Sequence, residues 1–209
     1  AHLCREHRLV TGGSGLVGAL AGLQNKTSLP STAGWSSPNE NSKGIVISGS
    51  CSLMTNKQVH SYREIAANYK VDINRCVNED GYIDVIEDWV LSQPKSSYFP
   101  MVFATVGSDE LREIQHRFGL DVSEKVERLF HELVKRLHQR GYQRFISAGG
   151  ETSGTVTQAL KITQFKVGTE IAPGVPWMSS LDGNVYLALK SGNFGNEHFF
   201  KLAQDIIND

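Results

Sequence analysis

Short apolar runs alternate with amphipathic stretches along most of the chain after residue 43. The apolar runs cover residues 44–48, 101–105, 144–148 and 185–190. Runs that are apolar throughout are typical of strands buried on both faces of a sheet. We therefore predict an α/β fold in which a mainly parallel sheet is covered by helices.

The stretches between the strands carry helical periodicity. We predict helices over residues 55–68, 83–91 and 122–140, with two more after residues 154 and 197. The helix at 122–140 has the clearest pattern, because its apolar residues recur at i, i+4, i+7, i+11 and i+15 and Gly141 follows as a C-terminal glycine. Near the end of the chain, Asp182-Gly183 separates two apolar runs, which predicts at least one antiparallel hairpin in the sheet.

The first 43 residues have a different pattern. Residues 8–11 are predicted to form a strand and residues 11–23, which are small and apolar, a helix. Residues 24–43 are rich in Ser, Thr, Asn, Pro and Gly without periodicity, which indicates a loop. We predict that residues 1–43 connect to a preceding domain outside this chain, and that residues 44–209 form a nucleotide-binding domain.

Composition excludes several classes of protein. The formal net charge of the 209 residues is −1, so the chain has no broad basic field for nucleic acid or an anionic membrane. No apolar stretch approaches the roughly 20 residues of a membrane helix. The three cysteines are widely separated and lack metal-ligand spacing, which favours a reducing cytoplasm.

Candidate chemistry lies first in residues 147–154, SAGGETSG, which follow a predicted strand and precede a predicted helix. Glycines allow backbone N–H groups to approach a phosphate closely, and Gly149, Gly150 and Gly154 can serve in this way. A helix that starts directly afterwards adds free N–H groups and the positive end of its dipole. The segment is therefore predicted to be a phosphate-binding loop.

Three polar residues of the same segment have candidate roles. Thr152 and Ser153 can cap the following helix or bond a phosphate oxygen. Glu151 would be repelled by a triphosphate unless a cation lay between them, so we predict that it holds a water bound to Mg²⁺. The alternative is an ordinary strand-to-helix turn with a capping hydroxyl, because the segment is neither a Walker A motif nor GxGxxG.

Two further junctions repeat this arrangement. Residues 44–52, GIVISGSCS, end in the candidate ligands Ser48, Ser50 and Ser52, and residues 187–195, LALKSGNFG, contain Lys190 and Gly192. Ligands of open parallel sheets bind beyond the carboxyl ends of the strands, so the three turns are expected to face one crevice. The alternatives are that the serines satisfy local backbone groups and that Lys190 is a solvated strand end.

Other constellations give weaker signals. The seven histidines show no HxxxH or HExxH spacing. The run GGSGLVG at residues 12–18 is close to a dinucleotide fingerprint, which keeps an oxidoreductase as an alternative. It lacks the acidic residue expected about 20 positions later and a convincing βαβ frame.

The motifs SGSCS, SAGGETSG and LALKSGNFG, in this order, resemble the C-terminal nucleotide-binding domain of the four-carbon acid sugar kinases. The opening LVTGGSGLVGAL resembles the passage between the two domains of that family, so the resemblance covers nearly the whole chain. The GGET form looks closest to the 3-oxo-tetronate kinase branch. The resemblance implies phosphorylation of a four-carbon sugar acid, such as 3-oxo-tetronate, threonate or erythronate, with ATP and Mg²⁺.

The resemblance also implies how the work is divided between domains. It places ATP contacts on serines within residues 48–52, on Gly149, Gly150, Glu151 and Thr152, and on Gly192. The sugar-acid contacts and the catalytic base belong to the family's N-terminal domain, whose DDFTGA-like motif does not occur here. We therefore expect a fragment without its own catalytic residue, inactive alone, and able to form a homo-oligomer. A non-catalytic nucleotide-binding regulatory module is the alternative.

Overall fold

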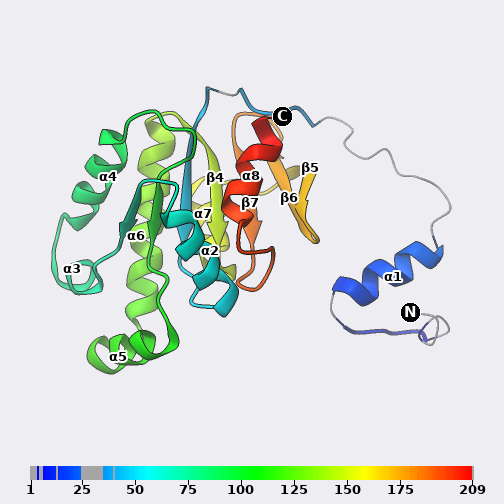
Figure 1. Ribbon diagram of the computed structural model, residues 1–209, viewed down its shortest axis with the longest axis horizontal. Coiled ribbons are helices and arrows are strands. Elements are labelled where there is room, and N and C mark those ends of the chain that lie inside the picture. The colour runs from blue at the N-terminus through cyan, green and yellow to red at the C-terminus, as the bar shows by residue number, and fades with distance from the viewer. Residues whose placement is uncertain (1–3, 5–6, 13, 25–34, 40, 209) are drawn as a thin grey trace. The chain divides into compact units, whose positions relative to one another are not determined.

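The computed structural model describes residues 4, 7–12, 14–24, 35–39 and 41–208, and it divides into two compact units, residues 1–33 and 34–209 (Figure 1). The first unit contains helix α1 (Ser14–Gln24), in agreement with the predicted helix. The strand predicted at residues 8–11 is wrong, because these residues have no strand conformation. An apolar run becomes a strand only where a neighbouring strand bonds to it, and no described residue pairs with this one.

The second unit contains a seven-stranded sheet in the order β2-β3-β1-β4-β7-β6-β5. The strands are β1 (Lys43–Ser48), β2 (Asn68–Lys70), β3 (Met101–Phe103), β4 (Tyr142–Ala148), β5 (Phe165–Ala172), β6 (Val175–Ser180) and β7 (Tyr186–Lys190). The helices are α2 (Leu53–Arg63), α3 (Ile73–Asn78), α4 (Tyr82–Ser92), α5 (Ser108–Phe118), α6 (Val122–Gln139), α7 (Gly150–Ala159) and α8 (Phe199–Asn208).

Both faces of the sheet are covered, as the apolar runs predict. In β1, Ile45 and Ile47 pack into a core that includes side chains of α4, α6 and α7, such as Phe130 and Val156. Val46 points to the opposite face and joins a core built with α2 and α8. Since successive strand residues point to opposite faces, this arrangement requires apolar side chains at all three consecutive positions 45–47 of β1.

The direction of the strands confirms the predicted mixed sheet. Strands β2, β3, β1, β4 and β7 are parallel, while β6 runs antiparallel to β7 and to β5. The β6-β7 hairpin turns at residues 181–185, where Gly183 has φ +73°, as Asp-Gly predicts. The β5-β6 hairpin, which turns at Gly174 with φ +78°, was not predicted.

Some helix boundaries differ from the predictions. Helix α2 begins at Leu53, because the Ser52 side chain accepts the Thr55 N–H and caps it. It ends at Arg63, and the residues up to 68 that were predicted as helix lead into β2, where Asn68 pairs with Met101. Helix α6 agrees closely with its prediction and is followed by Gly141 at φ +85°.

The segment before β1 joins the second unit. The Trp35 ring meets the Tyr186 ring edge-on at 5.6 Å between centroids, and a Cβ on Gly168 of β5 would collide with the Trp35 indole. The predicted boundary at residue 43 is therefore later than the start of this packing. Within the described ranges, no helix combines the length and apolar character needed to cross a bilayer.

Candidate nucleotide site

Three turns meet at the carboxyl edge of the sheet. Strands β1, β4 and β7 are consecutive neighbours and parallel, so their carboxyl ends lie side by side. The turns that follow them are the three segments predicted from the sequence, at residues 49–52, 149–150 and 191–195. The fold therefore brings together candidate residues that are distant in the chain, such as Ser52 and Gly192, which are 140 positions apart.

The turn after β1 is bonded to the end of β4. The backbone N–H groups of Gly49 and Ser50 both donate to the carbonyl of Ala148, each at 3.1 Å. A Cβ on Gly49 would collide with Thr152 Oγ1 and lie 3.1 Å from Glu127 Oε1. Glycine at this position therefore allows the first turn to lie against the start of α7.

The turn after β4 is hydrogen-bonded to the end of β7. Gly149 has φ +128° and ψ 140°, a conformation that residues with a Cβ rarely adopt, and its N–H donates to the Lys190 carbonyl at 2.9 Å. A Cβ on Gly149 would lie 3.0 Å from Thr152 Oγ1 and 3.3 Å from Ser50 N. This glycine is required both for backbone conformation and for close packing.

The turn after β7 returns to the first turn. The Gly192 carbonyl accepts from Ser52 Oγ at 2.7 Å and from Thr55 Oγ1 at 2.8 Å. A Cβ on Gly192 would lie 2.7 Å from Ser50 Oγ and 2.9 Å from Ser52 Cβ. The three turns are therefore linked in a closed ring of hydrogen bonds.

The structure corrects the prediction that residues 147–154 form a loop. Helix α7 begins at Gly150, so residues 150–154 are its first turns and only Gly149 is irregular. Its first hydrogen bond runs from Ser153 N to the Gly149 carbonyl at 2.9 Å. The N–H groups of Gly150, Glu151 and Thr152 consequently have no carbonyl acceptor within the helix, which is the feature that makes a helix start bind anions.

The hydroxyls of this segment do not cap α7, and Gly149, the residue at the cap position, has no side chain. Thr152 is buried and donates to Glu127 Oε1 at 2.8 Å. Ser153 Oγ lies 2.8 Å from Ser147 Oγ, which is buried at the end of β4. Gly154 is in the second turn of α7, and its carbonyl accepts from Thr157. Their side chains thus support the helix start.

Lys190 is fully buried, which corrects the alternative of a solvated strand end. Its Nζ donates to Thr55 Oγ1 at 2.9 Å and to the carbonyls of Ser191 and Gly192 at 3.1 and 2.9 Å. Burial lowers the pKa of Lys190 to about 8. All three ammonium hydrogens have protein acceptors, so Lys190 holds the third turn against α2 in this structure.

Ser48 lies apart from the ring of turns. Its side chain is fully buried between β1 and the segment after β3, where its Oγ is 2.6 Å from Thr105 Oγ1. Ser50 is half-buried, and its Oγ accepts the Ser52 N–H at 3.2 Å. Of the three predicted serines, Ser50 and Ser52 therefore take part in the contacts between turns and Ser48 supports the sheet.

The surroundings of the α7 start fit a phosphate group. Gly150 and Glu151 are exposed, and a Cβ on Gly150 would meet no atom within 4 Å. The described residues contain no group of three or more His, Cys, Asp or Glu side chains suited to hold a metal. A magnesium ion at this edge would therefore depend mainly on phosphate oxygens and water, with Glu151 available as an outer ligand.

Three contributors were missed by the sequence reasoning: Gly49, Thr55 and Glu127. Gly49 lies within the predicted SGS turn, so the requirement for a glycine there was available as a signal. Thr55 was recognised only as a helix start. Glu127 had no distinguishing signal, because it is one of several acidic residues on a charged helix and contacts the site only through the tertiary fold.

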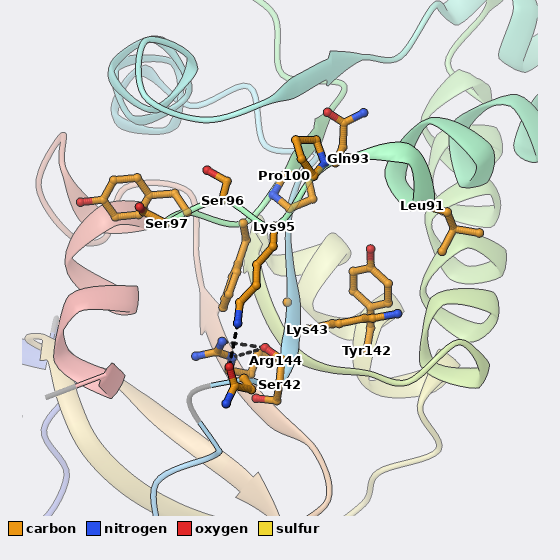
Figure 2. A pocket seen from close by; sticks show the side chains of 15 residues that line it. Ser42, Lys43, Leu91, Gln93, Lys95, Ser96, Ser97, Pro100, Tyr142 and Arg144 are labelled. Carbon is orange, nitrogen blue, oxygen red and sulfur yellow. Dashed lines mark hydrogen bonds between the residues drawn. The ribbon is translucent and has the colours of Figure 1, made fainter.

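A cavity lies at the opposite, amino edge of the sheet. It has a volume of about 550 Å³ and is lined by the starts of β1 and β4 and by residues 91–100 (Figure 2). Lys95 Nζ donates to Asn41 Oδ1 at 2.7 Å, and Arg144 donates to the Ser42 carbonyl at 2.6 Å. None of the predicted site residues lines this cavity.

The chain is similar to known proteins over nearly its full length. The family profile described as "Nucleotide-binding C-terminal domain" matches residues 45–200. Proteins named 3-oxo-tetronate kinase from Haemophilus influenzae and Brucella melitensis are 44% and 46% identical to this chain over the aligned residues. Their alignments cover 98% and 97% of this chain but 49% and 47% of the relatives. The chain thus spans about half the length of the curated relatives it matches.

A solved structure gives the same result in three dimensions. The crystal structure of Haemophilus influenzae protein HI1011 superposes with a TM-score of 0.82 at 43% identity. The match covers 99% of this chain and 50% of that protein. With the glycine turns, the family profile and these relatives in agreement, the chain belongs to the C-terminal nucleotide-binding domains of the four-carbon acid sugar kinase family.

Proposed function

We propose that this chain binds the ATP of a kinase that phosphorylates a four-carbon sugar acid of the 3-oxo-tetronate type. The observation that carries the proposal is the convergence of three glycine turns beyond the consecutive parallel strands β1, β4 and β7. The relatives named 3-oxo-tetronate kinase support the acceptor class.

In this proposal the free N–H groups at the start of α7 bind phosphate oxygens of the nucleotide. Gly192 lets the third turn approach Ser50 and Ser52 closely. Lys190 restrains the same turn by donating a hydrogen bond to the Gly192 carbonyl. ATP supplies the transferred phosphoryl group and Mg²⁺ neutralises its charge, and Glu151 can orient a water in the metal's shell. The described side chains of this edge position the donor.

The acceptor and the proton-accepting base are assigned to the N-terminal half of a longer protein. We propose that the chain alone binds nucleotide without turning over a sugar acid. Phosphoryl transfer requires the acceptor hydroxyl to be placed in line with the γ-phosphate. The described residues of the three turns are mainly glycine, serine and backbone groups, and the exposed carboxylate of Glu151 is assigned in this proposal to a water of the metal ion.

Calorimetric titration of the chain with ATP and Mg²⁺ tests the nucleotide site. We expect saturable binding, and we expect Gly192→Ala to weaken it about tenfold, the equivalent of roughly 1.4 kcal/mol. The reason is that the added Cβ would lie 2.7 Å from Ser50 Oγ. Gly22→Ala is the matched control, since a Cβ there meets nothing within 4 Å. A folded chain that gives no heat at millimolar ATP would refute the site.

Two further measurements separate the alternatives. Phosphorylation of a tetronate after addition of the N-terminal half of a relative would support the kinase, whereas nucleotide binding without activity in that mixture would favour a regulatory module. Titration with NADH separates the kinase from an oxidoreductase. We expect no NADH binding under conditions in which ATP binds.

A further inference from the structure

Glu127 connects α6 with two of the three turns at the carboxyl edge. Its Oε1 accepts a hydrogen bond from Thr152 Oγ1 at 2.8 Å, and it lies 3.1 Å from the position that a Cβ on Gly49 would occupy. Thr152 Oγ1 is itself in close contact with the Gly49 and Gly149 positions. One carboxylate oxygen thus meets the first turn and the start of α7 at their point of contact.

The direction of the hydrogen bond limits what Thr152 can do. A threonine hydroxyl has one hydrogen, and Thr152 donates it to Glu127 while its side chain remains buried. Its hydroxyl is therefore not available as a donor to a phosphate oxygen. Thr152 instead fixes the first turn of α7, whose N–H groups are the proposed phosphate ligands.

The remaining features of Glu127 are unusual for a residue that only stabilises the fold. Its Oε2 is buried and makes no hydrogen bond of ordinary geometry to a described residue, although the Thr155 hydroxyl is close enough to influence the carboxyl. Burial raises the pKa of the Glu127 carboxyl, and the charge of Glu151 adds to the rise, while the hydroxyls of Thr155 and Thr152 oppose it. A carboxylate oxygen that is buried without full hydrogen bonding is unfavourable for stability, and such features concentrate at functional sites.

We propose that Glu127 is a positioning residue for the nucleotide site. Through Thr152 it holds the start of α7 against the Gly49 turn, in the arrangement that presents the N–H groups of residues 150–152 to phosphate. The Glu127 carboxyl oxygen accepts the Thr152 hydroxyl hydrogen and so restrains the first turn of α7. The inference rests on the proposed ATP site and adds a residue outside the three turns.

The test compares ATP affinity with thermal stability in five single variants and one double variant. Glu127→Ala and Thr152→Val each remove the hydrogen bond, and we expect each to weaken ATP binding about tenfold. Glu127→Gln keeps an acceptor oxygen and Thr152→Ser keeps the hydroxyl, so both are expected to retain most of the affinity. Glu124→Gln, which removes an exposed carboxylate from the same helix, is the control.

The double variant Glu127→Ala/Thr152→Val tests whether the two residues act on ATP binding through one hydrogen bond. If the two residues act through one bond, the double variant binds ATP about as weakly as either single variant. Affinities of Glu127→Ala and Thr152→Val within twofold of the unaltered chain, or losses that add in the double variant, would overturn the inference and leave the ATP site intact. Absence of ATP binding by the unaltered chain would overturn both.

Discussion

The two edges of the sheet use positive charge in different ways. The amino edge has a cavity of about 550 Å³ with three basic residues, Lys43, Lys95 and Arg144, in its lining. The carboxyl edge has one buried lysine and a ring of glycine turns. At the amino edge, Lys95 and Arg144 bond the segment at residues 41–42. Cavity size and charge therefore favour the amino edge, whereas backbone geometry favours the carboxyl edge, which bears the family motifs and the proposed nucleotide site.

The largest effect is expected from Gly149→Ala, which would test whether the carboxyl edge depends on backbone conformation. At φ +128° an alanine is strained, and its Cβ would also crowd Thr152, so we expect a loss of about 2–3 kcal/mol in the free energy of unfolding. Urea denaturation measures it. Gly154→Ala is the control in the same helix, and it is expected to stabilise by about 0.5–1 kcal/mol because its Cβ meets no neighbour. If Gly149→Ala and Gly154→Ala changed the free energy of unfolding equally, the carboxyl edge would not depend on the backbone conformation of Gly149.

Lys190→Met tests the buried cation of the carboxyl edge. Methionine retains the apolar length but leaves the carbonyls of Ser191 and Gly192 and the Thr55 hydroxyl without the ammonium donor. We expect a loss of about 2 kcal/mol in stability, measured by urea denaturation, together with weaker ATP binding. A variant as stable as the unaltered chain would show that these bonds contribute little.

Stability at alkaline pH provides a second test of Lys190. Its pKa of about 8 in the folded chain is below the ordinary value of 10.5, so between these values the unfolded chain binds a proton that the folded chain does not. The Lys190 contribution to stability therefore increases as the pH rises through this range. Between pH 8 and 9.5 we therefore expect the free energy of unfolding of the unaltered chain to rise relative to that of Lys190→Met. Identical pH profiles would contradict the lowered pKa.

The smallest effect is expected at the amino edge. Lys95 is exposed and makes one hydrogen bond to Asn41, so Lys95→Ala should change stability by less than about 0.5 kcal/mol. ATP affinity should remain unchanged, because the residue lies at the other end of the parallel strands. A tenfold loss of ATP affinity in this variant would move the nucleotide site to the amino edge.

Much of the fold was accessible from the sequence because its signals are local. The apolar runs at 44–48 and 144–148, the periodicity of α6 and the Asp-Gly turn all reflect contacts or conformations set within a few residues. Strand β2 was missed, since Asn68–Lys70 is short and becomes a strand only by pairing with β3. The strand predicted at residues 8–11 is wrong because no described strand pairs with this apolar run.

The site was predictable in its motifs but not in the roles of their side chains. The glycines identify the three turns, yet no sequence pattern indicates that α7 begins at Gly150 or that Thr152 bonds to Glu127. Lys190 illustrates the same limit: its burial arises from Thr55 and Gly192 closing around it. Such roles depend on residues distant in the chain, and no local pattern encodes them.

The closed ring of hydrogen bonds has a consequence for the order in which the molecule assembles. Its links join Gly49 to Ala148, Gly149 to Lys190, and Ser52 to Gly192, the last pair 140 positions apart. Contacts between such distant segments form slowly, because long loops must close first. The edge that bears the family motifs can therefore be completed only after β7 has joined the sheet, and the amide hydrogens of the three turns should exchange with solvent in a common opening event.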